Sequence, residues 1–544
     1  MLAFFEGLVE NRFFFYSFSI LVLLVIVALA VLEWQEYRTK RKFSKQKVRY
    51  VRSPSSFLCL AFNKRFDLIE NEIMKKNGPI YGCNFLGKPT IVIDNPEIVQ
   101  LICHKEFHKF ANHRSISFGD PIFDHLLFAA ENAQWKRLRA IVSPAFSSGK
   151  LKKIKYVIDK TIQTMTMNLD ENIRTNSCVD IKELLGSFSI DTIIQMAFGL
   201  KVNSMQDPNN YTAKMAKQIF EEDITLRDTV LFCLGWTCPW LAKFFGFRFK
   251  PEAVNHFKKL TLEILNRKRD EISRNDTKLD MKRAPINFID LLLEVEIDSI
   301  KSNGSIENRM NQSFKHINEE EIMAQCVTFF MLGYSTTATS LTNALYLLTH
   351  NQAKQEKLYL SIMEVIEKLR IESPMIEDPF DLITAECLSR FEYLNAVLLE
   401  SLRLKTIAPA VDRVASEDAN LETSDGKICL EIKQGDAIRI LVENMHEDPR
   451  NFSNPEQFVP ERFMSQSDCI ETCNKQAFLP FGTGPRHCIA KNFALLEMKL
   501  ALLHLIRLYR FKVDELTKSK MDYYVNADLV ISKNVIVKVE KRSI

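Results

Sequence analysis

A single cysteine ends a glycine-rich turn in the stretch "PFGTGPRHCIA". The two glycines permit a tight turn and Pro485 stiffens it, and the apolar run that follows predicts a helix beginning near Ile489 or Ala490. A helix N-terminus favours the thiolate form of Cys488, which is the form that binds a metal. Such a thiolate is a suitable ligand for haem iron, and the forked guanidinium group of Arg486 is suited to bind a carboxylate. A buried structural cysteine is an equally weighted alternative.

The stretch resembles the cytochrome P450 signature FxxGxRxCxG through Phe481, Gly484, Arg486 and Cys488. Four other motifs occur in the family's order: "WKRLRAIVSPAFSSGKLKK" from Trp135, "FMLGYSTTATS" at 330–340, ExxR in "LLESLRL", and "FVPERF" at 458–463. One motif is weak evidence, but five in order identify the chain as a member of this family. The "WKRLR" and "LGYSTT" contexts are most similar to the animal microsomal family-3 and thromboxane-synthase group.

The resemblance implies that Cys488 is the thiolate ligand of a haem b (iron-protoporphyrin IX). It also implies a set of donors to the haem propionates: Trp135, Arg139, Arg413 and Arg486, with His113 or Arg114 near a further propionate position. Phe481 and Phe493 are expected near the porphyrin or in the proximal core. The ExxR residues lie three apart on one helix face, and in the family they form a buried structural network with the PERF arginine; here these residues are Glu400, Arg403 and Arg462.

The catalytic residues that the resemblance implies are Gly333, Ser335 and Thr336. A threonine hydroxyl inside a helix usually bonds the carbonyl three or four residues back, and we favour this interpretation for Thr337. Thr336 is assigned to the water chain that delivers protons, and Gly333 to the space for oxygen.

Three positions depart from the family pattern: Leu332 is larger than the usual Ala or Gly, Ser335 replaces an acid, and Ala490 replaces a glycine. A hydroxyl is a weaker proton relay than a carboxylate. The departures at Leu332 and Ser335 therefore bear on oxygen activation and leave haem ligation unaffected.

Most of the segments that must position these residues have apolar side chains at helical spacing. We expect helices at 129–142, 180–198, 255–273, 319–350, 351–368 and 392–405, and short strands near 80–94, 430–442 and 528–540. The expected fold is mainly α with small β-sheets, the cytochrome P450 fold. The polar stretch 298–318 is the best candidate for a disordered loop. No GxGxxG, P-loop or HExxH motif is present, so a dinucleotide or ATP site of the usual kind has no support.

An uncharged apolar stretch of 20 residues covers 13–32, long enough as a helix to cross a bilayer. The net charge is +4, and residues 38–52 alone carry eight Lys or Arg and no acid. This local basic excess predicts a cytosolic domain after an uncleaved anchor, which we favour over a cleaved signal peptide, and it does not indicate nucleic-acid binding. The scattered cysteines suit a reducing compartment.

These features predict a lumenal N-terminus at 1–12, a transmembrane anchor at 13–33, a basic linker at 34–54 and a P450 domain at 55–544. We expect a single-pass protein of the endoplasmic reticulum membrane that inserts one atom of O₂ into a lipophilic substrate. Electrons would come from NADPH through a separate NADPH-cytochrome P450 reductase, with cytochrome b5 as an accessory partner. Lys136, Arg137 and Lys491 are candidate docking residues for the reductase. The apolar stretch 231–247 is either a membrane-contacting segment or part of the core.

Two other hypotheses remain at this point. A P450-fold isomerase or dehydratase of a peroxide needs no reductase, which Ser335 favours and Thr336 disfavours. A non-catalytic haem-binding protein would use the fold without turnover.

Overall fold

The structure is a computed structural model of the whole chain. It describes residues 30–52, 65–85, 87–114, 120–175, 177–200, 204–207, 210–223, 225–237, 239–244, 250–274, 287–302, 316–465, 473–524 and 529–543, together with residues 19, 23, 26, 202 and 248.

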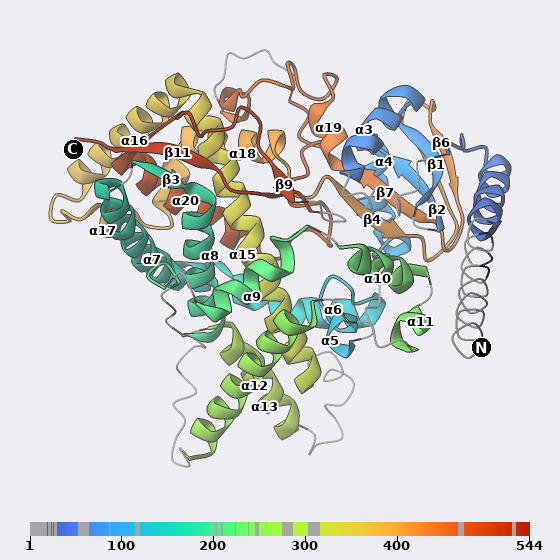
Figure 1. Cartoon of the computed structure of the whole chain (residues 1–544), viewed down its shortest axis with the longest axis horizontal. Helices are drawn as coiled ribbons and strands as arrows, with labels where there is room; N and C mark the ends of the chain where they lie inside the picture. The colour runs from blue at the N-terminus through green and yellow to red at the C-terminus, as the bar shows by residue number, and fades with distance from the viewer. Residues whose placement is uncertain are drawn as a thin grey trace, which may run out of the picture.

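One long helix, α15 (Glu319–His350), crosses the middle of the molecule (Figure 1). Its N-terminus carries a capping box, in which the Asn318 side chain accepts the Glu321 N–H at 2.8 Å and the Glu321 side chain accepts the Asn318 N–H. Three glutamates in the first turn also place negative charge at the helix N-terminus, where the helix dipole favours it. The helix is buried along most of its length and packs against α8 (Ile181–Phe198), α12 (Pro251–Arg274), α18 (Glu392–Leu404) and α20 (Lys491–Leu508).

Most of the remaining helices surround this core, and the others lie beside the strands described below (Figure 1). They are α3 (Phe66–Asn77), α4 (Pro96–Gln100), α5 (Pro121–Asp124), α6 (Asn132–Val142), α7 (Ser148–Thr175), α9 (Tyr211–Phe220), α10 (Leu226–Thr237), α11 (Pro239–Phe244), α13 (Phe288–Ser302), α16 (Gln352–Glu372), α17 (Pro379–Leu382) and α19 (Val442–Glu447). A π-helical turn, η1 (Leu101–Lys105), follows α4, and the PERF segment forms the 3₁₀ turn η6 (Pro460–Phe463).

A four-stranded sheet in the order β1-β2-β7-β4 forms the other side of the molecule. Its strands are β1 (Ile80–Phe85), β2 (Lys88–Ile93), β7 (Ala437–Leu441) and β4 (Ala410–Val414). β2 and β7 are parallel and the other pairs antiparallel. The smaller sheets are β3 (Cys178–Asp180) with β11 (Ile536–Lys541) and β8 (Tyr509–Lys512), β5 (Ala419–Glu422) with β6 (Cys429–Ile432), and β9 (Tyr523–Tyr524) with β10 (Ile531–Ser532).

The described architecture confirms the predicted class, mainly helical with small sheets. The helix expected at 319–350 coincides with α15, while α6 begins at 132 instead of 129. The sequence did not predict α7, whose many Lys, Thr and Asn residues weaken its apolar periodicity. Within the predicted loop 298–318, residues 298–302 belong to α13, and 303–315 lie outside the described residues.

The predicted anchor at 13–33 and the segment before it lie mostly outside the described residues. No helix in the described part of the chain is both long and apolar enough to cross a bilayer. Residues 30–45 are helical, so much of the segment predicted as a linker has regular structure.

This N-terminal helix is fixed to the four-stranded sheet. Phe43 is fully buried, and a Cβ atom at Gly82 of β1 would lie 2.5 Å from its ring. Gln46 Nε2 donates to Asp436 Oδ2 at 2.6 Å, and Lys42 forms an ion pair with the same carboxylate. The basic segment therefore packs on the domain over part of its length.

Candidate active site

Cys488 lies in a loop at residues 479–490, the cysteine loop, whose shape depends on two glycines. Gly482 and Gly484 have φ angles of +68° and +71°, which strain any other residue. A Cβ atom at Gly484 would lie 2.0 Å from the Cys103 carbonyl oxygen, so no side chain fits there. The Cys488 N–H donates to the Phe481 carbonyl oxygen at 2.8 Å. The backbone therefore determines where the thiol is presented.

The helix after the loop begins at Lys491 with Ala490 as its N-cap, slightly later than predicted. Cys488 is accessible, yet desolvation by the surrounding protein raises the pKa of its thiol, while the Ala490 N–H and the charges of Arg139 and Lys491 lower it. The helix N-terminus alone therefore does not produce the expected thiolate. A bound metal cation deprotonates such a thiol.

A cluster of three arginines lies beside this loop: Arg139, Arg413 and Arg486. Desolvation and the charges of Arg413 and Arg139 lower the pKa of Arg486 to about 9. Arg139 Nη1 donates to the His487 carbonyl oxygen at 3.0 Å. Arg413 is buried, and its Nε has no hydrogen-bond partner among the residues described. Clustered guanidinium groups of this kind need anions, so the site fits the two propionates of a haem.

Arg486 also has a structural role that the motif does not reveal. Its Nε and Nη2 donate to the carbonyl oxygens of Ala111 and Ala130 at 2.7 Å each, and Nη1 donates to that of Leu127 at 3.4 Å. Its guanidinium carbon lies 4.2 Å from the centroid of the buried Trp135 ring. A guanidinium has five N–H groups, so Arg486 keeps donors for a propionate while it fixes the surrounding backbone.

The structure distinguishes the two candidates for the further propionate position. His113 Nδ1 lies 3.3 Å from Arg413 Nη1 and 3.2 Å from Asp412 Oδ1, within the arginine cluster. Arg114 Nη2 instead donates to Thr90 Oγ1 on β2 at 3.2 Å. His113 is therefore the better-placed of the two.

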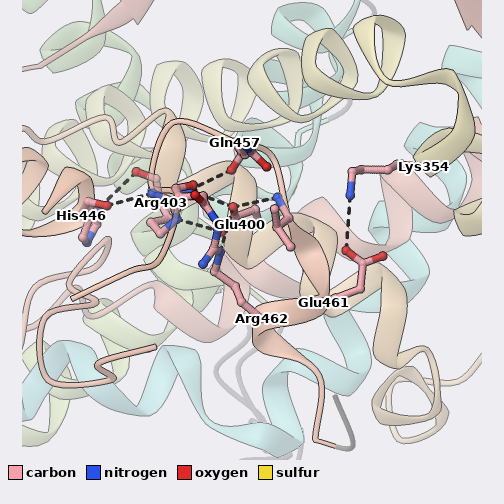
Figure 2. A network of polar contacts seen from close by, with 9 residues as sticks. Lys354, Glu400, Arg403, His446, Gln457, Glu461 and Arg462 are labelled. Atoms are coloured by element: carbon pink, nitrogen blue, oxygen red, sulfur yellow. Dashed lines mark hydrogen bonds and ion pairs between the residues drawn. The ribbon is translucent and has the colours of Figure 1, made fainter. Parts of the chain in front are cut away.

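Glu400, Arg403 and Arg462 form a buried network (Figure 2). Arg403 Nε and Nη2 donate to the two Glu400 carboxylate oxygens at 2.8 Å each, and Arg462 Nε donates to Glu400 Oε1 at 3.1 Å. Arg403 also donates to the carbonyl oxygens of His446 and Gln457. The three residues thus meet in the structural network that the resemblance predicts.

His446 connects this network to the cysteine loop, and no motif pointed to it. Its carbonyl oxygen accepts Arg403 Nη1 at 2.8 Å, and its ring Nε2 accepts the Leu479 N–H at 2.9 Å. Desolvation and the charge of Arg403 lower the pKa of His446 to about 3. The ring therefore stays neutral and keeps its acceptor for the loop.

On α15, Leu332, Gly333 and Thr336 are partly exposed, whereas Ser335 and Thr337 are buried. Thr336 Oγ1 donates to the Leu332 carbonyl oxygen at 2.6 Å. The back-bond that we favoured for Thr337 is therefore present at Thr336. The role of Thr336 in proton delivery stays a prediction.

The other two predicted catalytic residues have packing environments of their own. A Cβ atom at Gly333 would lie 2.5 Å from Ile193 Cδ1, so this glycine permits close contact between α15 and α8. Ser335 is 1% exposed, and its hydroxyl has no hydrogen-bond partner in the described part of the chain. A hydroxyl enclosed without partners is poorly placed to pass a proton. The space for oxygen at Gly333 stays a prediction.

A polar cluster next to this segment was missed by the sequence analysis. Tyr334 Oη donates to Glu221 Oε1 at 2.6 Å, and Lys182 Nζ forms an ion pair with the same oxygen. Burial and the Glu221 charge raise the pKa of Tyr334 well above its ordinary value. The cluster joins α15 to α8 and to the end of α9. Its partners are 39 and 113 positions apart, so no local pattern reveals it.

The two phenylalanines expected near the porphyrin differ in burial. Phe493 on α20 is 2% exposed and its ring centroid lies 6.4 Å from that of Phe329. Phe481 is partly buried in the cysteine loop. Phe493 is thus a core residue of the helix that follows the loop, and Phe481 is the one presented beside Cys488.

A buried acid, Glu497, lies on α20 beyond the cysteine loop. It is fully buried, and neither carboxylate oxygen has a hydrogen-bond partner among the residues described. Desolvation raises the pKa of Glu497 well above its ordinary value. The folded chain therefore retains a proton on Glu497 that the unfolded chain releases above about pH 4.

We expect Glu497→Gln to stabilise the protein increasingly as pH rises. Below the unfolded pKa the acid is neutral in both states, so wild type and variant unfold alike. Above it, the wild type loses about 1.4 kcal/mol per pH unit until the pH passes the folded pKa, and glutamine avoids this loss. Unfolding midpoints at pH 5 and pH 7.5 measure the difference. The exposed Glu515→Gln is the control, and a pH-independent effect of Glu497→Gln would contradict the interpretation.

A mainly helical domain that presents one cysteine thiol beside clustered arginines defines a haem-thiolate protein. The family model "Cytochrome P450" matches residues 55–539, and the chain belongs to the cytochrome P450 family. It is 30% identical over 464 residues to cytochrome P450 9c1 of Drosophila melanogaster, covering 83% of this chain and 84% of the relative. It is 28% identical over 489 residues to cytochrome P450 3A56 of Fundulus heteroclitus (89% and 90%) and over 492 residues to cytochrome P450 3A5 of Homo sapiens (89% of each).

These similarities support the family-3 resemblance. The protein is a cytochrome P450 monooxygenase, an oxidoreductase whose cofactor is haem. Family membership also implies a redox partner and a small-molecule substrate.

Proposed function

We propose that this monooxygenase oxidises a lipophilic small molecule with electrons from NADPH, delivered by a separate NADPH-cytochrome P450 reductase with cytochrome b5 as an accessory donor. The observation that carries the proposal is the accessible Cys488 thiol beside the arginine cluster. Haem, when bound, supplies the activation of O₂ for insertion into the substrate. Cys488 would hold its iron, and Arg139, Arg413, Arg486 and His113 would hold its propionates.

On the other side of the cofactor, Thr336 is proposed to hold water and a proton on the face that it shares with Leu332. Its Oγ1 already carries a proton directed at the Leu332 carbonyl oxygen. With haem bound, the Leu332 side chain would take up space on this face and would exclude bulk water from it. Ser335 is proposed to contribute nothing to the relay, because its hydroxyl is enclosed.

We propose that the chain is a single-pass protein of the endoplasmic reticulum membrane with its P450 domain in the cytosol. The similarity to family-3 relatives and the basic run at 38–52 support this location. Three large side chains of α10 and α11 are exposed: Leu226, Trp240 and Phe244, at 63%, 69% and 78%. Exposed aromatic and aliphatic groups of this size suit contact with a bilayer, from which a lipophilic substrate could enter.

Two of the candidate reductase-docking residues remain suitable. Lys136 and Lys491 are exposed near the cysteine loop. Arg137 instead donates to Glu321 Oε2 at 3.0 Å and bonds the His316 carbonyl oxygen. Its charge is paired with that of Glu321 within the domain, so we propose Lys136 and Lys491 alone as docking residues.

Reconstitution of the full-length protein with the reductase tests the function. We expect NADPH and O₂ consumption that rises with a lipophilic substrate from a panel of steroids, fatty acids and drugs, together with oxygenated product. Turnover of a hydroperoxide without NADPH would instead support the isomerase hypothesis. Bound haem without turnover under either condition would contradict both.

A further inference from the structure

A cavity of about 760 Å³ is lined by none of the residues of the cysteine loop. It lies between the C-terminal end of α15, the end of α18, the segment before η6 and the segment before β9. Its lining includes none of the predicted haem contacts. Tyr346, on its wall, comes ten residues after Thr336, about 15 Å along the helix axis. The volume is in the range of small-molecule sites.

About half of the residues that line this cavity are aromatic or aliphatic: Tyr346, Leu347, Leu404, Phe458, Val459, Met521 and Tyr523. Tyr346 is held in place because its Oη donates to the Ser519 carbonyl oxygen at 2.7 Å. Its ring centroid lies 4.2 Å from that of His350. A flat apolar body would therefore find a preformed surface.

The charged part of the lining is mainly cationic. Lys354, Lys405 and Lys520 line the cavity, with Glu456 as its acidic member, beside the neutral polar groups of Asn351, Gln457 and Ser519. Lys520 is exposed at the rim. Lys354 and Lys405 are both partly buried, and Lys354 forms an ion pair with Glu461 at 3.4 Å.

Lys405 has no ion pair within the described part of the chain. Desolvation lowers its pKa; Glu443 and Glu447 on α19 and Arg65 act on it electrostatically, the carboxylates favouring the ammonium and Arg65 opposing it. Glu443 is itself bonded by Asn71 Nδ2 at 3.2 Å. The Lys405 ammonium is thus a partly buried cation that contacts no counter-charge among the residues described, and such a group favours an anion.

We propose that this cavity binds an amphiphilic anion, with its carboxylate or sulfonate on Lys405 and its apolar body against Tyr346 and Phe458. The site shares no lining residue with the predicted haem contacts and does not depend on the proposed function. Its ligand would also touch Gln457 and Val459, whose backbone groups bond Arg403 and Glu400. Occupancy therefore adds contacts to the buried network.

The test uses the full-length holoprotein and a matched pair of probes, 1-anilinonaphthalene-8-sulfonate and the neutral N-phenyl-1-naphthylamine. Titration calorimetry measures affinity, and the Soret band shows whether a probe enters the haem pocket. We expect Lys405→Gln to weaken sulfonate binding about tenfold or more, the worth of a charge-assisted hydrogen bond, while the neutral probe changes little. The Soret band stays unchanged throughout the titration.

Two further variants keep the test decisive. Ser519→Trp, at the exposed rim, fills the cavity without altering Lys405 and should abolish binding of the sulfonate. Lys427→Gln, an exposed lysine outside the cavity, should bind both probes like the wild type. Equal sulfonate affinity in the wild type, Lys405→Gln and Ser519→Trp overturns the proposal, as does binding accompanied by a Soret shift.

Discussion

We expect the reduced wild-type protein to show a red-shifted Soret band with carbon monoxide, and a Cys488→Ser variant to lose it. The band depends on a thiolate ligand, and a serine hydroxyl does not ionise readily enough to replace it. The glycines and the hydrogen bond from the residue 488 N–H to the Phe481 carbonyl oxygen keep the loop shape in the variant. Absorption difference spectra of the full-length protein, read together with haem content, measure the effect. Monooxygenase turnover should fall to background with the band.

A second thiol provides the control for this experiment. Cys387 lies in a 3₁₀ turn before α18, and its thiol donates to the Thr384 carbonyl oxygen at 3.2 Å. Cys387→Ser is expected to keep both the band and the turnover. A normal band in Cys488→Ser would assign the iron ligand to another residue.

Glu400→Gln is expected to destabilise the fold by about 3–5 kcal/mol, the range for removing one partner of a buried ion pair. The substitution removes the Glu400 charge that the buried Arg403 and Arg462 share. Because Arg403 also bonds His446, which in turn bonds the cysteine loop, the variant should also retain less haem. Urea unfolding and the haem content of the purified protein measure the two effects.

An exposed pair serves as the matched control. Glu372 accepts two hydrogen bonds from Arg390 at 2.6 and 2.7 Å near the surface, and Glu372→Gln should cost less than about 1 kcal/mol. Glu400→Asp keeps the charge on a shorter side chain, and its loss of stability should lie between those of Glu400→Gln and Glu372→Gln. The network has no special role if Glu400→Gln is as stable as Glu372→Gln and binds haem fully.

The motif residues were predictable because each one depends on local chemistry or short spacing. The glycines around the thiol and the i,i+3 pair at Glu400 and Arg403 both appear in the sequence before any fold is known. The resemblance then supplied the long-range partner Arg462. Such features account for the mainly helical class and for most residues around Cys488.

Other features of the site depend on distances that the sequence does not contain. Tyr334 donates to Glu221 only because α9 ends beside α15. Arg137 donates to Glu321 only because α6 approaches the start of α15. The side chain of Ser335 occupies a motif position, yet its burial depends on which face of α15 packs inward. Burial and long-range pairing are properties of the tertiary fold, so one chain without a structure could not show them.

The carbonyl contacts of Arg486 bear on how the protein matures. Ala111, Leu127 and Ala130 satisfy this side chain from the polypeptide itself, and the loop glycines fix the thiol in the same way. The backbone therefore sets the orientation of Arg486 as the chain folds, and a folding error in this segment would displace a donor that the haem propionates need.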